Sequence, residues 1–315
     1  MQKFYIIIAK LLSKIINFLN IKKKFTNNIN FNLGLNNLLK ISDNYNNMTR
    51  LDQSECKIFS QNGEDGILNY LITMLKIERP NFIEIGVGSY VEANTRFIYD
   101  RFAPKGIIID SEKNLSSKVF SNINSWKGDL RIVEERVSTE NINSIISKNC
   151  DFEVDIFSLD IDSVDYWIID KLNSNISKIF VAEYNAIFGS SLAITVPNLK
   201  DFDRKKYHYS HLCYGMSLKA LINIMKKKNF YFIGTNSIRN NAFFISNDLP
   251  FDKYFKNLQV NDINYYVNSN IRESRDMNNK LNYLSGENKL KEIYDCEVVD
   301  VLSDSEKKVK IRDLI

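Results

Sequence analysis

The most regular pattern in the sequence starts near residue 54, where short apolar runs alternate with stretches of helical periodicity. Five apolar runs have strand length, at residues 81–86, 106–110, 130–134, 154–160 and 178–184. Helical patterns begin after Gln61, near 93, over 114–122, from Thr139, from Asp165 and over 216–228. Such alternation predicts a doubly wound, mostly parallel α/β sheet. Two closing runs at 230–233 and 242–245 add an antiparallel edge, which makes seven strands.

The first 24 residues show a different pattern, with apolar positions at helical spacing and lysines on the opposite side. The apolar positions are Phe4, Ile7, Ile8, Leu11, Leu12, Ile15, Ile16 and Leu19. This spacing predicts an amphipathic basic helix. Lys10 and Lys14 interrupt the apolar stretch, which argues against a membrane span or a signal peptide. Such a helix could bind an anionic membrane surface as a peripheral contact. Alternatively, it could pack against the rest of this chain or against a second subunit.

The remaining pattern divides the chain into four parts. Residues 25–53 are polar and rich in asparagine, which predicts a linker. Residues 54–250 hold the predicted α/β domain, and 251–315 form a charged extension expected to pack on it or on another subunit, with a helix over 287–294 and a short strand over 296–301. The loop over 185–214 is long enough to predict a lid or a binding loop.

Composition limits the possible partners. The 42 basic and 38 acidic residues are mixed along the sequence and give a net charge of +4, so no broad cationic face for nucleic acid is expected. The four cysteines, Cys56, Cys150, Cys213 and Cys296, are far apart and form no Cys-x-x-Cys motif. Their spacing favours neither a disulfide framework nor a zinc ribbon, and a reducing cytoplasm is the simplest compartment.

The most informative motif ends the first predicted strand. There an apolar run leads into Glu84, Gly86 and Gly88, and Asp110 ends the next strand. Glycine lets the backbone approach a ligand closely, and an acid at this spacing can accept both hydroxyls of a ribose. A dinucleotide motif requires a third glycine, where this sequence has Val91. The pattern therefore favours a smaller nucleoside cofactor over NAD.

Seven segments in order resemble the FkbM-like class I S-adenosylmethionine-dependent methyltransferases. They are 60–67 (SQNGEDGI), 84–88 (EIGVG), 93–96 (ANTR), 158–167 (SLDIDSVDYW), 183–185 (EYN), 188–189 (FG) and 240–244 (NNAFF). The resemblance covers about residues 54–300 and implies a Rossmann-like seven-stranded fold that binds S-adenosylmethionine. It implies cofactor contacts at Gln61, Glu64, Glu84, Gly86, Gly88, Asn94 and Asp110. For Gln61, Glu64 and Asn94, helix capping is the alternative role.

Acidic residues mark the expected catalytic position. Asp160 and Asp162 follow the fourth strand and Glu183 ends the fifth, so all three are expected at the carboxyl edge of the sheet. Either aspartate could serve as the general base, with Glu183 in support, and the three are also candidate ligands for Mg²⁺. The alternative is that Asp162, together with Asp165, stabilises the start of the next helix.

The only two histidines, His208 and His211, lie in the long loop. His208 is a second candidate base, reaching the substrate from the lid side. A zinc site completed by Cys213 and surface exposure are the alternatives for this pair.

The expected function is O-methylation of a hydroxyl on a glycan or surface-polysaccharide precursor. This expectation rests on the family resemblance and on the amphipathic first helix, since lipid-linked precursors lie at the cytoplasmic leaflet. Two alternatives remain open: a binding or scaffold protein that keeps the sheet without catalysis, and an NAD-linked or nucleotide-sugar enzyme on the same fold.

Overall fold

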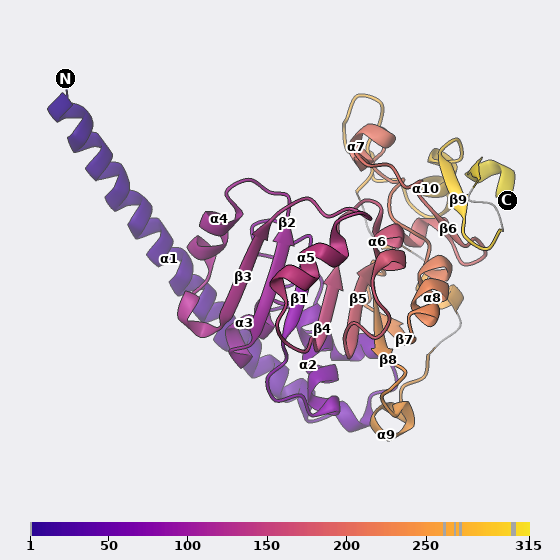
Figure 1. Cartoon of the computed structure of the whole chain (residues 1–315), viewed down its shortest axis with the longest axis horizontal. Helices are drawn as coiled ribbons and strands as arrows, with labels where there is room; N and C mark the ends of the chain where they lie inside the picture. The colour runs from indigo at the N-terminus through magenta and orange to yellow at the C-terminus, as the bar shows by residue number, and fades with distance from the viewer. Residues whose placement is uncertain (1, 261–262, 268, 271–272, 304–306) are drawn as a thin grey trace.

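The computed structural model describes residues 2–260, 263–267, 269–270, 273–303 and 307–315. A seven-stranded sheet forms its centre (Figure 1). The strands are β1 Phe82–Ile85, β2 Lys105–Asp110, β3 Asp129–Glu134, β4 Ile156–Leu159, β5 Ile179–Glu183, β7 Phe230–Thr235 and β8 Asn241–Ser246.

The order of the strands is β3-β2-β1-β4-β5-β8-β7. The first five strands in this order run parallel, and β8 lies antiparallel between β5 and β7. The order reverses between β1 and β4, so a crevice opens there at the carboxyl ends of the strands. This arrangement confirms the predicted doubly wound sheet of class I methyltransferase type, including its antiparallel edge.

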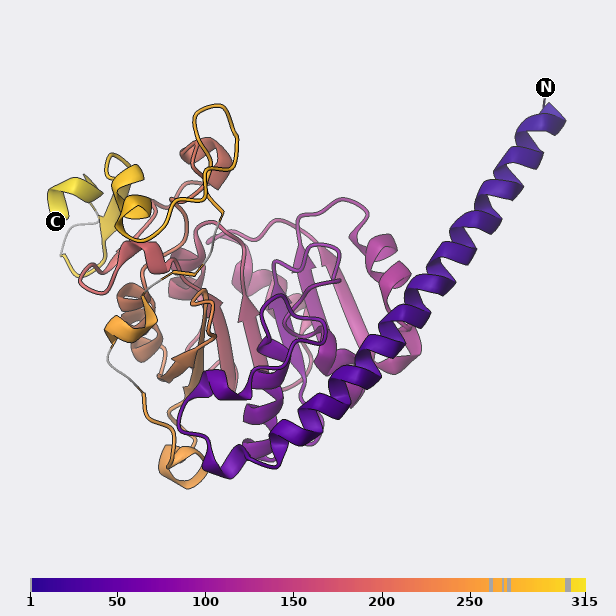
Figure 2. The ribbon, with the colours of Figure 1, turned by 180° about the vertical axis from the view of Figure 1, so that it is seen from behind.

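Helices cover both faces of the sheet (Figures 1 and 2). The helices of the described residues are α1 Gln2–Ser42, α2 Glu64–Leu75, α3 Arg96–Phe102, α4 Leu115–Asn122, α5 Ile142–Asn149, α6 Asp165–Lys171, α7 Arg204–Tyr207, α8 Leu218–Lys227, α9 Phe251–Phe255 and α10 Glu287–Glu292, of which α7 and α10 lie beyond the carboxyl edge of the sheet. Buried residues of α5, α6 and α8 form one apolar core with the sheet, and those of α1, α2, α3, α4 and α9 form the other. The strands are apolar on both faces because both faces are covered.

The predicted linker over 25–53 is wrong in its first half, because α1 continues to Ser42. Apolar residues at helical spacing explain this continuation: Leu38 is fully buried, and Phe31 and Leu35 pack against the same core. Gly34 lies on this contact, where a Cβ would stand 2.6 Å from the Ile58 side chain. Asparagine costs less than 1 kcal/mol per helical residue, so packing of the apolar side outweighs the polar composition. Two 3₁₀ turns, Tyr45–Asn47 and Leu51–Ser54, then lead into the domain.

A second, smaller sheet joins the long loop to the chain's last segment. Its order is β10-β9-β6, with β6 at Ile194–Thr195, β9 at Glu297–Asp300 and β10 at Lys308–Lys310. The predicted helix over 287–294 and strand over 296–301 are thus found as α10 and β9. Because β6 belongs to the 185–214 loop, its pairing with β9 fixes that loop at the carboxyl edge of the main sheet.

Candidate functional site

A cavity of about 820 Å³ opens at the carboxyl edge of the sheet, where the strand order reverses. Its walls are the segments that follow β1, β2, β3 and β4, together with residues 198–205 of the long loop. Cavities of this size hold drug-sized ligands and lie at this place in open α/β sheets. The position of the cavity therefore follows from the topology alone.

The turn after β1 forms one wall of the cavity through Gly86 and Gly88. Both glycines have positive φ, at 86° and 51°. A Cβ on Gly86 would stand 1.6 Å from the carbonyl oxygen of Asp160, so only glycine fits there. A Cβ on Gly88 would meet no atom within 4 Å. Gly86 thus holds the turn against β4, and Gly88 leaves bare backbone facing open space.

Asp110 ends β2 and lines the same cavity. One carboxylate oxygen accepts a hydrogen bond from the Gly88 backbone N–H at 2.8 Å, and the other accepts one from Glu112 N–H at 2.8 Å. Each carboxylate oxygen can accept a second bond. Asp110 therefore fixes the glycine turn and still has acceptor capacity for a pair of ligand hydroxyls.

Two predicted cofactor residues, Glu84 and Asn94, do not line the cavity. The Glu84 carboxylate is buried and accepts hydrogen bonds from the backbone N–H groups of Asn94 and Thr95, at 2.8 and 3.0 Å, just before α3. The Asn94 side chain donates to the Ser158 hydroxyl at 3.1 Å. These hydrogen bonds hold the start of α3, and neither residue is part of the cavity wall.

The other two predicted contacts, Gln61 and Glu64, are also directed elsewhere. Gln61 is exposed, outside the cavity. Glu64 is buried and accepts hydrogen bonds from Asn236 at 2.7 Å and from Asn241 at 2.9 Å, as well as from the backbone of Asn62 at 2.8 Å. Glu64 therefore joins the start of α2 to the β7–β8 hairpin, a structural role close to the capping alternative.

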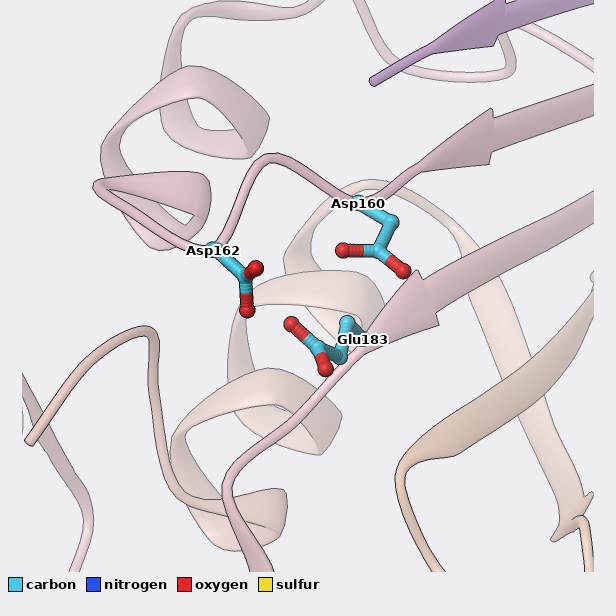
Figure 3. Close-up of side chains that lie close together, drawn as sticks. All are labelled: Asp160, Asp162 and Glu183. Atoms are coloured by element: carbon cyan, nitrogen blue, oxygen red, sulfur yellow. The ribbon is translucent and has the colours of Figure 1, made fainter. Parts of the chain in front are cut away.

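Asp160, Asp162 and Glu183 converge as predicted (Figure 3). One potential ligand oxygen from each lies within 4.8 Å of the others. The carboxyl groups of Asp160 and Glu183 are close enough for each to affect the ionisation of the other. Burial raises the pKa of Asp160, and the charges of Asp162 and Asp165 raise it further. Burial and the charge of Asp160 raise the pKa of Glu183 in the same way.

Asp162 has a different environment from the other two acids. It has a positive φ of 53°, and its carboxylate accepts a hydrogen bond from the Arg204 guanidinium at 2.8 Å. Arg204 also pairs with Glu273 at 3.5 Å and lies over the Tyr214 ring at 5.0 Å. The long loop is thereby tied to the end of β4 through one partly buried cation.

Asp165 supports the turn that carries Asp162. Its two carboxylate oxygens accept the backbone N–H groups of Ile161 at 3.0 Å and Ser163 at 2.9 Å. Burial raises its pKa to about 6, against these hydrogen bonds, which favour the ionised form. Asp165 is the first residue of α6 and holds the turn before it without capping the helix, while Asp162 points to the other acids and to Arg204.

The histidine predictions are wrong in position. His208 lies outside the cavity wall; its Nδ1 is 2.7 Å from the Ser210 hydroxyl, and burial lowers its pKa. Across the described residues, the acidic trio is the one group of three His, Cys, Asp or Glu side chains with metal-ligand spacing. His208, His211 and Cys213 therefore do not form the alternative zinc site. The Asn185 side chain donates hydrogen bonds to the Leu212 and Tyr214 carbonyls, at 2.8 and 3.1 Å, and so holds this part of the loop.

Sequence reasoning missed two parts of the wall. Residues 135–140 follow β3 and line the cavity beside Asp110. Their place could have been predicted, because β3 pairs in parallel with β2 and the two strands end at the same edge. Phe202 and Arg204 come from the long loop, and no local sequence pattern marks the residues of a loop that fold inward.

No protein-family model and no curated protein matches the sequence. Among solved structures, an S-adenosylmethionine-dependent methyltransferase from Clostridium acetobutylicum aligns at 10% identity and a TM-score of 0.39, over 58% of this chain and 90% of that one. A SAM-dependent O-methyltransferase from Thermotoga maritima aligns at 13% and 0.30, over 56% and 63%.

TrmK from M. capricolum, in complex with S-adenosylhomocysteine, aligns at 10% identity and a TM-score of 0.32, over 56% of this chain and 65% of that one. This chain thus spans less than two thirds of TrmK and of the Thermotoga protein. At such scores the fold assignment rests on the strand order described above.

Proposed function

We propose that this protein is an S-adenosylmethionine-dependent methyltransferase that methylates a hydroxyl group of a glycan. One observation carries the proposal: the Gly86–Gly88 turn, Asp110 and Asp160 line one cavity, and Glu183 lies next to Asp160 behind the wall. The close approach of Gly86 to the Asp160 carbonyl connects the glycine turn to the acidic residues. A nucleoside-binding half and a proton-accepting half are the two parts that this reaction requires.

The nucleoside half has groups suited to adenosine. Asp110 has free acceptor capacity for the two ribose hydroxyls, beside the bare backbone of Gly88. The segment 135–140 and Phe202 line the adjoining wall, where a flat base would lie. With Val91 at the place of the third glycine, a cofactor without a pyrophosphate fits this turn better than NAD.

The acidic half has a group able to remove a proton. The sulfonium methyl of the bound cofactor would supply the transferred carbon, and the leaving thioether is neutral. Burial and neighbouring charges raise the pKa values of Asp160 and Glu183, which makes both stronger bases than ordinary carboxylates. Asp160 lies on the cavity wall and is the proposed base, with Glu183 behind it.

The glycan part of the proposal is supported by polar side chains in the cavity wall. Ser163, Asn198 and Lys200 line the cavity and offer both donors and acceptors. Hydroxyl-rich acceptors use such groups. The resemblance to FkbM-like enzymes in residues 158–167 and 183–185 points the same way.

The same three carboxylates offer a second role, as ligands for Mg²⁺. Carboxylate oxygens are the ligands this ion prefers, and the spacing of Asp160, Asp162 and Glu183 fits a single cation. Mg²⁺ there would orient a sugar diol and lower the pKa of its hydroxyl. Transfer measured in EDTA and again with added Mg²⁺ separates this role from that of a metal-free base.

Transfer of a radiolabelled methyl group from S-adenosylmethionine tests the proposal directly. The purified protein is incubated with a panel of polysaccharides and lipid-linked oligosaccharides, and with the Asp160→Asn variant as the control. Label that appears in an acceptor with the native protein only, and is stable to base as an ether, supports O-methylation. Cofactor binding without label in any acceptor favours the scaffold alternative.

A further inference from the structure

Helix α1 has an apolar side that nothing in the described structure covers. The outward residues are Phe18, Ile21, Phe25, Ile29 and Leu33, which are between 43 and 69% exposed. They recur every three or four positions, so they form one stripe along the helix. Burial in this protein's own core therefore accounts for only one of the two apolar sides of α1.

At Leu33 the exposed side of α1 is opposite the core side. Phe31, Leu35 and Leu38 pack into the core with α2 and α3. Leu33 lies two positions from both Phe31 and Leu35, which at 3.6 residues per turn places it on the far side of the helix. The Phe31 ring, 6.3 Å from Phe59 and 6.0 Å from Phe97, fixes the rotation of α1 and with it the outward direction of the stripe.

Figures 1 and 2 show that the first half of α1 extends past the body. Contacts with the body include Asn27, whose side chain donates to the Asn122 carbonyl at 3.4 Å, and Phe31, which lies under the Lys127 ammonium at 4.9 Å. Two exposed aromatic residues lie in these same neighbouring segments: Phe120 in α4 and Trp126, which is 81% exposed. Aromatic residues of this kind are enriched at membrane surfaces.

The charge of α1 identifies the partner. The helix contains seven lysines and no acidic residue, whereas all 38 acidic residues lie elsewhere in the chain. Two copies of α1 packed together would bring fourteen positive charges, two sets of seven, to one interface, which opposes a dimer through this stripe. An anionic lipid surface attracts the lysines and accepts the apolar stripe at the same time. Within the described residues, no helix meets the length and apolarity needed to cross a bilayer.

We infer that α1 is the docking surface of this protein for an anionic lipid bilayer, with the stripe from Phe18 to Leu33 inserted and the lysines against the head groups. The structure extends the sequence-based expectation in one respect: the docking side continues beyond residue 24, on the side of α1 away from the core. This inference is independent of the proposed methyl transfer, since it rests on α1 alone.

Sedimentation with vesicles tests the inference with the full chain. The native protein is mixed with vesicles of phosphatidylcholine alone or with 30% phosphatidylglycerol. We expect binding to the anionic vesicles that falls at least tenfold in 0.5 M salt and on neutral vesicles. A native protein that does not bind the anionic vesicles would overturn the inference.

Two variants and two controls locate the surface. Phe18→Gln, Phe25→Gln and Ile29→Gln together remove the stripe, and Lys14→Gln, Lys22→Gln and Lys24→Gln together remove charge. Each triple variant should lose at least tenfold in vesicle binding while its melting temperature stays unchanged, because the side chains are partly or fully exposed. The controls are Met277→Gln with Leu302→Gln, and Lys148→Gln, Lys226→Gln and Lys256→Gln, which are exposed on other elements.

The oligomeric state of the native protein tests the alternative that a second copy of the chain covers the stripe. If the native protein is a dimer by light scattering, becomes a monomer when the stripe is removed, and shows no vesicle binding, a second copy covers the stripe and the inference is wrong. Vesicle binding that survives in both triple variants would also overturn it, because the lipid contact would then lie elsewhere.

Discussion

Gly86 and Asp160 are in such close contact that a single methyl group cannot fit between them. A Cβ at position 86 would stand 1.6 Å from the Asp160 carbonyl oxygen and 2.6 Å from its carbonyl carbon. The contact joins the end of β1 to the end of β4, which are neighbours in the sheet. It therefore couples the position of the proposed cofactor turn to the position of the proposed base.

The two glycines of the turn should respond differently to alanine. Gly86→Ala places a methyl group against backbone at positive φ, so we expect a loss of stability of more than about 4 kcal/mol, or insoluble protein. Gly88→Ala meets open space and carries only the strain of φ 51°, about 1–2 kcal/mol. Its methyl group should instead weaken S-adenosylhomocysteine binding. Thermal unfolding and calorimetry measure the two effects, and equal stability of the two variants would contradict this view of the turn.

Removal of the proposed base should abolish turnover and leave the cofactor bound. Asp160→Asn and Glu183→Gln are each expected to lower kcat by about 10²–10⁴, the usual contribution of a general base. The dissociation constant for S-adenosylhomocysteine should change by less than about threefold, a small difference in binding free energy. Asp170→Asn, in an exposed part of α6, is the matched control. Full activity in the Asp160 variant would exclude it as the base.

The pH profile of kcat/KM should report the acid pair. The base must be ionised to accept a proton, so activity should rise with pH through the raised pKa of the Asp160–Glu183 pair. The charge of Asp162 contributes to raising both pKa values, so Asp162→Asn should move this rise to lower pH. Asp170→Asn should leave it in place. A rise that stays at the native pH in the Asp162 variant would argue against the pair as the titrating group.

Stability should depend on pH through Asp65. Its buried carboxylate accepts the backbone N–H groups of Ile58, Phe59 and Ser60 on one oxygen, at 2.6–2.8 Å, and burial raises its pKa to about 7. Between about pH 4 and 7 the folded chain keeps this proton while the unfolded chain has lost it, so stability falls as pH rises through that window.

Asp65→Asn should therefore flatten the fall in melting temperature over that range, since the asparagine oxygen can accept the same hydrogen bonds without a charge. The exposed Asp129→Asn should follow the native curve. If the Asp65 variant loses melting temperature over this pH window as steeply as the native protein, another group is responsible.

The parallel, doubly wound sheet with its antiparallel edge could be predicted from the sequence because the central strands are mostly apolar and helical patterns separate the parallel strands. The full length of α1 could not be predicted from the sequence. Its second half is rich in asparagine, and the fact that Phe31, Leu35 and Leu38 face a core depends on α2 and α3, which lie far along the chain. Local composition says nothing about such tertiary contacts.

Site residues at the ends of strands could be predicted from the sequence. Site residues whose role depends on the direction of the side chain could not. Asp110, Asp160 and Glu183 follow strands, so topology brings them to one edge. Glu84 belongs to a strand next to them, yet its carboxylate turns to the N–H groups before α3. Arg204 reaches Asp162 from a loop whose path is set by pairing between β6 and β9, more than a hundred residues apart.

Calorimetric titration with S-adenosylmethionine and S-adenosylhomocysteine, with NAD as the control ligand, tests the central claim most directly. The account predicts micromolar binding of the first two, no binding of NAD, and at least tenfold weaker binding in Asp110→Ala, which loses the acceptors proposed for the ribose hydroxyls. Binding of NAD alone, or no binding of either sulfur compound by folded native protein, would contradict it.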